Sequence, residues 1–408
     1  MKLNIVLVVL LIIAAAAAAI VYFGGSPSES PEPPVAVATE GTLDLLVFGV
    51  EGLEPTIAEA LMDEGRMPNL SALMESGAYG EFDNFGKIKD PKIVWTSLVT
   101  GMKPENQGLG SKRVHRERIV DVALLSTNRT VDTIWTLLAA DGSSVAVLGW
   151  PGTWPAEEID GGVVAGPYTQ YVLERAHNHR HADGISPDSA VEQLDPLYIT
   201  EDAIKRADLS EFVNLDSRLG LEGLVGQNYV SLANAMANDT SMRSLVLSVI
   251  NDPGVRNVLV YDNALNNVTQ RYWHYMKPEC LDDAAMGDEA RAVLKSQAEA
   301  LGETLERYYE HTDELLGSYM KMVADGGTVV LVVDHGYEGV KIDRSGVPRV
   351  GFDMHSRRGF FVMAGPRVRQ GVRADEGDLI DVAPTIMEAA GIKLPSSLDG
   401  RVHEEILR

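Results

Sequence analysis

Short apolar runs alternate with amphipathic stretches along most of the chain. The run Leu43–Val50 is almost continuously apolar, which is typical of a strand buried on both faces of a sheet. Further strand-like runs are Val145–Leu148, Asn257–Tyr261, Thr328–Val333 and Gly359–Met363. Helical patterns occupy 55–77 with a break near Pro68, 131–140, 290–322 and 378–390. Strands alternating with helices predict an α/β fold, with three α/β/α layers around a mostly parallel central sheet.

The first 42 residues have a different pattern and are expected to lie outside the folded domain. Residues Ile5–Phe23 form an unbroken apolar run, and as a helix rising about 1.5 Å per residue they would nearly span a bilayer core of about 30 Å. We expect 1–23 to be a transmembrane signal anchor. Lys2 is its only flanking charge, so the N-terminus should be cytoplasmic and the main domain extracytoplasmic. Cleavage of this segment is the alternative, and it would give a secreted protein.

A linker and one large domain account for the rest of the chain. Residues 24–42 are rich in proline, serine and glutamate and predict a solvated spacer. Residues 43–408 are interpreted as one domain, with a cap-like insert at about 166–252 where the pattern weakens. The single cysteine, Cys280, excludes an intrachain disulfide and a cysteine metal cluster. With 59 acidic against 35 basic residues the net charge is −24, so a nucleic acid polymer is not an expected partner.

Candidate metal ligands follow two of the predicted strands. Glu51 comes directly after the first strand, and Asp334 and His335 come after the run TVVLVV. Sites in parallel sheets form at the carboxyl ends of strands, and a carboxylate beside an imidazole is a common ligand pair for a divalent cation. A helix cap with a chance histidine is the alternative. His355 precedes a later strand, where it is either a further ligand or a solvated loop histidine.

Several motifs follow one another along the chain: WTSLVTGMKPENQG, GWPGTWPAEEIDG, VYDNALNNVTQRYWHYMKPE, DHG, DVAPTIMEAAGI and LDGR. In this order they resemble the motifs of the alkaline phosphatase superfamily, in particular its type I phosphodiesterase/nucleotide pyrophosphatase branch. The resemblance extends from about Leu43 to the end of the chain. It implies an alkaline-phosphatase-like fold and a two-metal centre, usually of zinc. In such a centre a metal-activated threonine or serine attacks phosphorus and forms a covalent intermediate.

The chain departs from this family at positions that the resemblance implies are catalytic. The first-strand aspartate is Glu51, and the nucleophile position is Pro91, which has no nucleophilic oxygen. The aspartate and histidine of one metal are replaced by Asn266 and Gln270, neutral amides that bind zinc poorly. We therefore expect the usual phosphoryl transfer to be severely impaired or absent.

The remaining ligands divide unequally between the two metals. Glu51, Asp334 and His335 could hold one divalent cation, with zinc as the expected ion and manganese or magnesium as alternatives. The other metal would keep only His355, so a full two-metal site is not expected.

Residues near Pro91 are weaker candidates for a role at the site. Asp90 could attack phosphorus as a carboxylate, and Thr96 could do so as a hydroxyl. Lys92, together with Lys87 and Lys89, could bind an anion, and a solvated basic loop is the alternative.

The sequence therefore favours a membrane-anchored, catalytically impaired relative of the phosphodiesterases that is retained for binding. The alternative is an active phosphoester hydrolase that uses one metal and Glu51, Asp334 and His335. The expected ligand is a phosphoester or another small anion. An interaction module that binds another exported protein is a third possibility.

Overall fold

The computed structural model describes residues 40–86, 88, 90–109, 113–115, 118–120, 124–176, 181–251, 255–277, 287–337, 341–342, 348–349 and 354–408. The predicted anchor and most of the linker lie outside this part of the chain. Residues Val37–Arg408 form one compact unit. No helix among the described residues is long and apolar enough to cross a membrane.

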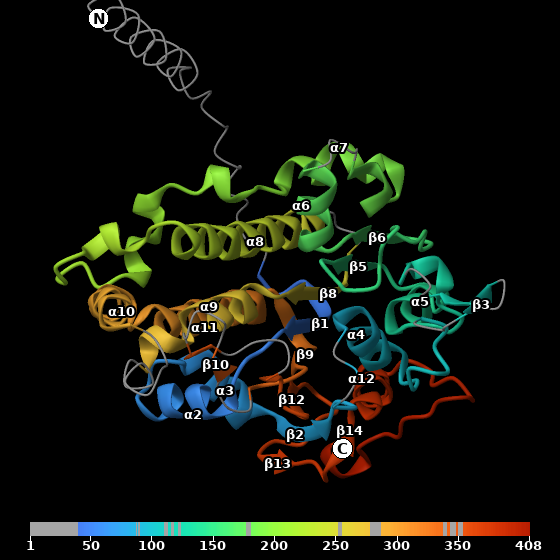
Figure 1. The fold of residues 1–408 in the computed structure, drawn as a ribbon. Helices are drawn as coiled ribbons and strands as arrows, with labels where there is room; N and C mark the ends of the chain where they lie inside the picture. The colour runs from blue at the N-terminus through green and yellow to red at the C-terminus, as the bar shows by residue number, and fades with distance from the viewer. Residues whose placement is uncertain are drawn as a thin grey trace, which may run out of the picture. The chain divides into compact units, whose positions relative to one another are not determined.

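A ten-stranded mixed sheet forms the centre of this unit (Figure 1). The strands lie in the order β13 (Val372–Arg373), β2 (Ala78–Asp83), β12 (Arg358–Ala364), β9 (Val323–Val333), β1 (Leu43–Val50), β8 (Asn257–Asp262), β5 (Val145–Leu148), β6 (Gly162–Ala165) and β7 (Ile185–Ser186), with β14 (Gly377–Asp378) paired to β2. Strand β1 is parallel to both β8 and β9. Strand β12 runs antiparallel between β9 and β2, and β7 runs antiparallel to β6. The expected α/β sheet is thus confirmed, with a parallel centre and mixed edges.

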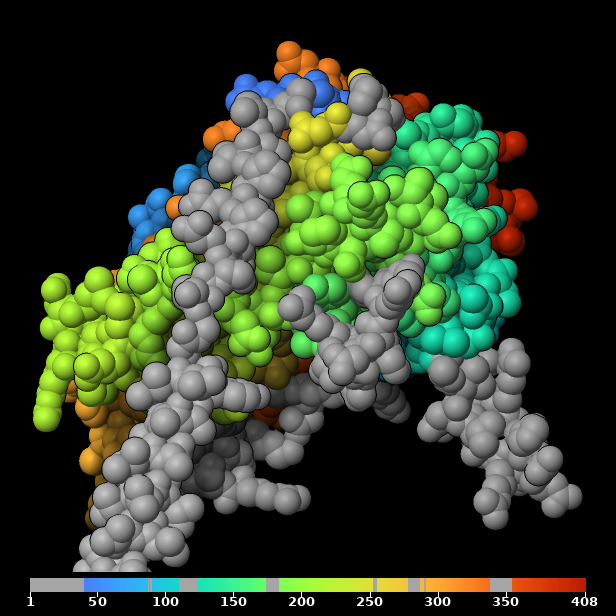
Figure 2. All heavy atoms as spheres, turned by 90° about the horizontal axis from the view of Figure 1, so that it is seen from above, coloured from blue at the N-terminus to red at the C-terminus, as the bar shows by residue number. Residues whose placement is uncertain are grey.

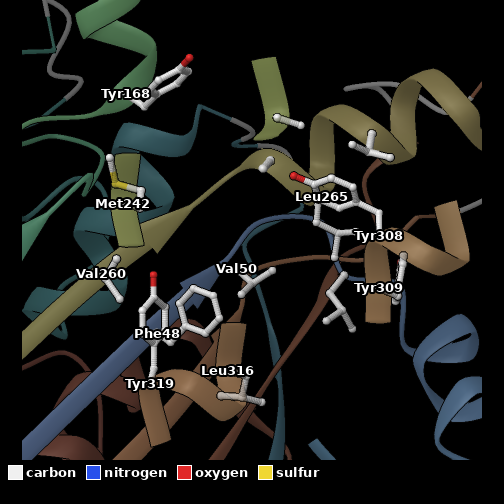
Figure 3. Packing of buried hydrophobic residues seen from close by; sticks show 14 of the residues in the cluster. Phe48, Val50, Tyr168, Met242, Val260, Leu265, Tyr308, Tyr309, Leu316 and Tyr319 are labelled. Atoms are coloured by element: carbon white, nitrogen blue, oxygen red, sulfur yellow. The ribbon is translucent and has the colours of Figure 1, made fainter. Parts of the chain in front are cut away.

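Helices cover both faces of the sheet, which explains the continuous apolar run of β1. Leu46, Phe48 and Val50 face a core formed with α2 (Pro55–Asp63), α3 (Pro68–Ser76), α8 (Gln227–Ile250), α9 (Ala264–Met276) and α11 (Thr304–Met320). Leu45 and Val47 face a second core with α4 (Pro91–Thr100), α5 (Ile134–Ala140) and α12 (Val382–Ala390). Figure 3 shows the first core, where the rings of Phe48 and Tyr319 meet edge to face at 5.1 Å.

Several predicted boundaries differ from the structure. The helical pattern at 290–322 is divided at Gly302 into α10 (Asp288–Leu301) and α11. The sequence interpretation missed β2 and β6. The stretch at 166–252 contains α6 (Tyr168–Ala176), α7 (Val191–Leu194), short 3₁₀ turns and the long helix α8. Figure 2 views the face that this green stretch covers. Because α8 contributes to the first core, this stretch includes an integral part of the helical layer.

A buried acid pair joins α8 to β8. The buried carboxyl groups of Asp239 and Asp262 lie close enough to influence each other's pKa, and Tyr308 of α11 donates to Asp239. Burial raises the pKa of Asp239 to about 6, and burial together with Asp239 raises the pKa of Asp262 well above its usual range. His311 lies 3.2 Å from Asp239, but burial lowers its pKa. The imidazole therefore adds little compensating positive charge near neutral pH.

We expect Asp239→Asn to gain stability relative to the wild type as pH rises from about 4 to 7.5. The folded wild type retains a proton that the unfolded chain releases in this range, which costs up to about 1.4 kcal/mol per pH unit for each proton. Asparagine mimics the protonated carboxyl and removes this dependence. Urea denaturation at several pH values measures the difference, with the exposed Asp216→Asn as control. A difference that is constant with pH would contradict the assignment.

Candidate metal centre

Glu51, Asp334 and His335 meet at the carboxyl ends of β1 and β9. These strands are parallel neighbours, and Val50 is paired with Val333. The residues that follow the two strands are therefore placed side by side. All three side chains are buried, with relative exposures of 2–4%. The structure thus brings together three of the four metal ligands expected from the sequence.

The spacing of these groups is close to that required by one ion. The Nε2 atom of His335 lies 3.9 Å from a Glu51 oxygen and 3.7 Å from an Asp334 oxygen. One ligand atom from each residue lies within 4.8 Å of the others. Ligands held about 2.1 Å from a tetrahedral zinc ion are roughly 3.4 Å apart. Small side-chain movements would therefore let the three residues hold one divalent cation.

The hydrogen bonds at His335 favour the same conclusion. Its Nδ1 atom lies 3.0 Å from the Gly336 carbonyl, which favours a hydrogen on Nδ1, so that the neutral imidazole presents its Nε2 lone pair to the carboxylates. Within the described structure, His335 Nε2 and Asp334 Oδ1 are buried and accept no hydrogen bond. Buried polar atoms are rarely left without a partner, and a cation would provide one for both.

The centre carries displaceable protons near neutral pH. Burial, reinforced by the Glu51 charge, raises the pKa of Asp334 to about 7. Burial opposes protonation of His335, but the Asp334 and Glu51 carboxylates raise its pKa above the usual value. A bound cation would remove both protons, because it stabilises the deprotonated ligands.

We therefore expect cation affinity to rise with pH and to level off above about pH 8. Below pH 7 the cation must displace one or two protons, so affinity should fall about tenfold to a hundredfold per pH unit. Isothermal titration with Zn²⁺ or Mn²⁺ between pH 5.5 and 8.5 measures this dependence, and measurement in two buffers gives the number of protons released. An affinity independent of pH would contradict this protonation scheme.

Tyr261 is a further member of the centre that the sequence interpretation missed. Its hydroxyl donates to the second Glu51 oxygen, and burial raises its pKa well above the usual value, so it remains a donor. The register that pairs Tyr261 with Gly49 on β1 brings it to Glu51. The sequence feature that could have indicated this role is the position of Tyr261, one residue before the end of the strand that neighbours β1.

The residues that the resemblance assigns to a second metal contact other side chains of the described structure. Asn266 and Gln270 lie one turn apart on α9, and the Gln270 amide donates to Asn266 Oδ1 at 3.0 Å. The Tyr337 hydroxyl donates to the same oxygen. The ring of His355 stacks on His335 with centroids 3.5 Å apart.

The candidate residues near the expected nucleophile position lie on α4 or directly before it. Pro91 is the first residue of α4, and Asp90 is its N-cap, accepting from the Lys92 amide at 3.0 Å. Thr96 is buried next to Gly152. The Lys92 side chain is half-buried, and its binding of an anion remains a prediction. Lys87 and Lys89 lie outside the described residues.

A small cavity lies next to the candidate ligands. Its volume is about 10 Å³, which is close to the space needed by a single water molecule. The described residues that line it are Asn84, Gly86, Ile88, Val94, Asp334, His335, His355 and Ser356. Asp90, Pro91 and Thr96 are not among them.

Comparison with known proteins identifies the family. The type I phosphodiesterase/nucleotide pyrophosphatase family matches residues 45–400, whereas no curated protein matches the whole sequence closely enough to be significant. A mutant of alkaline phosphatase PafA is 10% identical, with a TM-score of 0.51 over 89% of this chain and 99% of that one. It shares the fold.

Two other solved structures are also similar. Human ectonucleotide pyrophosphatase/phosphodiesterase 5 is 11% identical, with a TM-score of 0.46 over 90% of this chain and all of that one. The phosphonate monoester hydrolase from Silicibacter pomeroyi is 13% identical, with a TM-score of 0.41 over 88% and 75% of the two chains. Since the family match covers most of the chain, this protein belongs to the type I phosphodiesterase/nucleotide pyrophosphatase family.

Proposed function

We propose that this chain is a membrane-anchored, extracytoplasmic member of the family that binds one divalent cation and a small anion but no longer transfers phosphoryl groups through a covalent intermediate. The observation that carries the proposal is Pro91. It occupies the first position of α4, where the resemblance implies the nucleophile, and it has no oxygen with which to attack phosphorus. Loss of the covalent route would remove several kcal/mol of catalysis, and each 1.4 kcal/mol is about tenfold in rate.

The three-ligand centre supports the binding role. A tetrahedral cation held by Glu51, Asp334 and His335 would keep a fourth position for an anion oxygen. One imidazole with two carboxylates suits zinc, and manganese or magnesium would be accepted less readily. The bound cation would provide positive charge in a buried pocket, where its attraction to an anion would be strong.

A groove that includes Gln270 in its wall would provide room for the organic part of such a ligand. Its volume is about 670 Å³, and it lies between α6, α8 and α9 with Gln270 on its wall. The described residues that line it are neutral apart from Arg271. In a chain of net charge −24, a groove without acidic lining residues would be the least repulsive place for an anionic ligand.

The test is a hydrolase screen combined with metal analysis. We expect bis-p-nitrophenyl phosphate and nucleotide substrates to be hydrolysed no faster than in a blank, with Zn²⁺, Mn²⁺ or Mg²⁺ present. Titration should show one ion per chain. Turnover well above the blank that disappears in Asp334→Asn would refute the proposed loss of activity.

A second candidate function is hydrolysis by a water activated directly at a single ion. It is favoured by three protein ligands with an open fourth position, which is the usual arrangement of catalytic zinc. It predicts turnover with one ion per chain and no phosphorylated protein after acid quenching. Absence of any bound ion would exclude it.

The location is proposed from residues 1–23, whose apolar run suits a signal anchor. We expect the full-length protein in the membrane fraction after carbonate washing, with its C-terminus accessible only from the extracytoplasmic side. Recovery in the soluble extracellular fraction, with a shortened N-terminus, would show a cleaved signal instead.

A further inference from the structure

We propose that the phenol of Tyr337 stands where a second ion would have to lie, and that Tyr337, Asn266 and Gln270 together make this a one-ion centre. The inference concerns how many ions bind. It does not depend on whether the protein turns over a substrate, and it assigns Tyr337 a role that the sequence motifs do not indicate.

The Tyr337 ring fills the space between the histidines and α9. It meets the rings of His335 and His355 edge-on, with centroids 5.6 Å away in both cases. Its hydroxyl reaches Asn266 on α9. A second ion bound by His355 and by the side chains at positions 266 and 270 would have to lie between these three residues. The phenol of Tyr337 occupies the space between His355 and Asn266.

The hydroxyl end of the ring is closely packed on its other side. A methyl group added at Gly52, which follows Glu51, would approach the Tyr337 oxygen to 2.9 Å and Asn266 Oδ1 to 3.0 Å. Real Cβ atoms essentially never approach another atom closer than 3.0 Å, so the hydroxyl end of the ring is packed against the backbone at Gly52.

The backbone holds Tyr337 in this position. Its amide donates to Glu54 at 2.7 Å, and the Glu54 amide in turn contacts the Tyr309 hydroxyl at 2.9 Å. Tyr337 also forms an isolated β-bridge with His355. These contacts tie the backbone at Tyr337 to the N-cap of α2 and to the segment that precedes β12, so the position of its side chain is built into the fold.

Hydrogen bonds among Tyr337, Asn266 and Gln270 take the place of the contacts that a second ion would make. Asn266 Oδ1 accepts from both Tyr337 and Gln270. An incoming cation would have to displace both donors, and neither amide would compensate it with negative charge. Restoring metal ligands at positions 266 and 270 should therefore be insufficient for the binding of a second ion while the Tyr337 hydroxyl remains.

The test compares zinc content in a series of variants. Asn266→Asp with Gln270→His restores the ligand types, and adding Tyr337→Phe or Tyr337→Ala removes the hydroxyl or the whole phenol. Each protein is equilibrated with Zn²⁺ by dialysis and analysed by mass spectrometry. Circular dichroism confirms folding. Adding Tyr309→Phe to the double variant is the matched control, since it removes a neighbouring buried hydroxyl.

We expect the double variant to bind the same number of ions as the wild type, and a Tyr337 variant in that background to bind one more. The Tyr309 control should bind no more than the double variant. A second ion in the double variant with Tyr337 intact would overturn the proposal. So would unchanged stoichiometry in both folded Tyr337 variants. Turnover assays are not used, so these outcomes are separate from failure of the proposed function.

Discussion

Asp334→Asn is expected to weaken divalent-cation binding by more than about 100-fold, the upper end of the loss seen when an outer-shell partner of a metal ligand is removed. Asp334 supplies one of three ligand atoms that lie within 4.8 Å of one another. Asparagine keeps the shape of the side chain but removes its charge, and a neutral amide is a poor zinc ligand. Isothermal titration or competition with a zinc indicator measures the effect.

The same substitution should not destabilise the cation-free protein. The Asp334 carboxyl is buried beside Glu51, and its pKa is raised to about 7. Above pH 7 the folded protein must hold a second buried carboxylate charge beside Glu51, which the variant avoids. We therefore expect the free energy of unfolding of cation-free Asp334→Asn to equal or exceed that of the wild type at pH 8.

Asp325→Asn is the matched control, because Asp325 lies on the same strand β9 but is exposed. It makes the same change of charge and should leave affinity unchanged. Two results would remove the basis for a metal centre at this sheet edge: equal affinities in all three proteins, or no cation bound by the wild type.

The hydrophobic pattern of the sequence predicted this edge of the sheet well, because neighbouring parallel strands place their carboxyl ends at the same edge. The apolar runs of β1 and β9 indicated two strands with acids after them, and their pairing places Glu51 beside Asp334. Nothing more than strand type and adjacency was needed for this part of the site.

Other members depend on contacts between distant segments, which one sequence does not reveal. Tyr261 reaches Glu51 from β8, 210 residues away. Tyr337 reaches Asn266 over 71 residues. The sequence interpretation missed helix α8 because its apolar residues are distributed around the whole helix. This distribution arises because α8 contacts both the core and the turns that cover it. A helix with such a mixed environment lacks the one-sided periodicity that identifies a helix from its sequence.

Trp95→Ala is expected to cost about 3–5 kcal/mol of unfolding free energy, the usual range for truncating a buried aromatic residue. Trp95 on α4 is fully buried. Its ring meets those of Trp150 at 5.3 Å and Tyr261 at 4.9 Å, both edge to face. A methyl group at Gly49 on β1 would approach the Trp95 ring to 2.7 Å, so the indole fills the space directly beneath the strand that leads to Glu51.

The substitution should also weaken cation binding in the protein that remains folded. Tyr261 donates to Glu51, and loss of the indole would remove one of the rings that hold Tyr261 in place. We expect a fall of about tenfold, typical of a weakened outer-shell contact. Urea denaturation and zinc titration measure the two effects, and Leu215→Ala, at a side chain 56% exposed, should change stability by no more than about 0.5 kcal/mol. Lost stability with unchanged affinity would show that Trp95 supports the core without positioning Glu51.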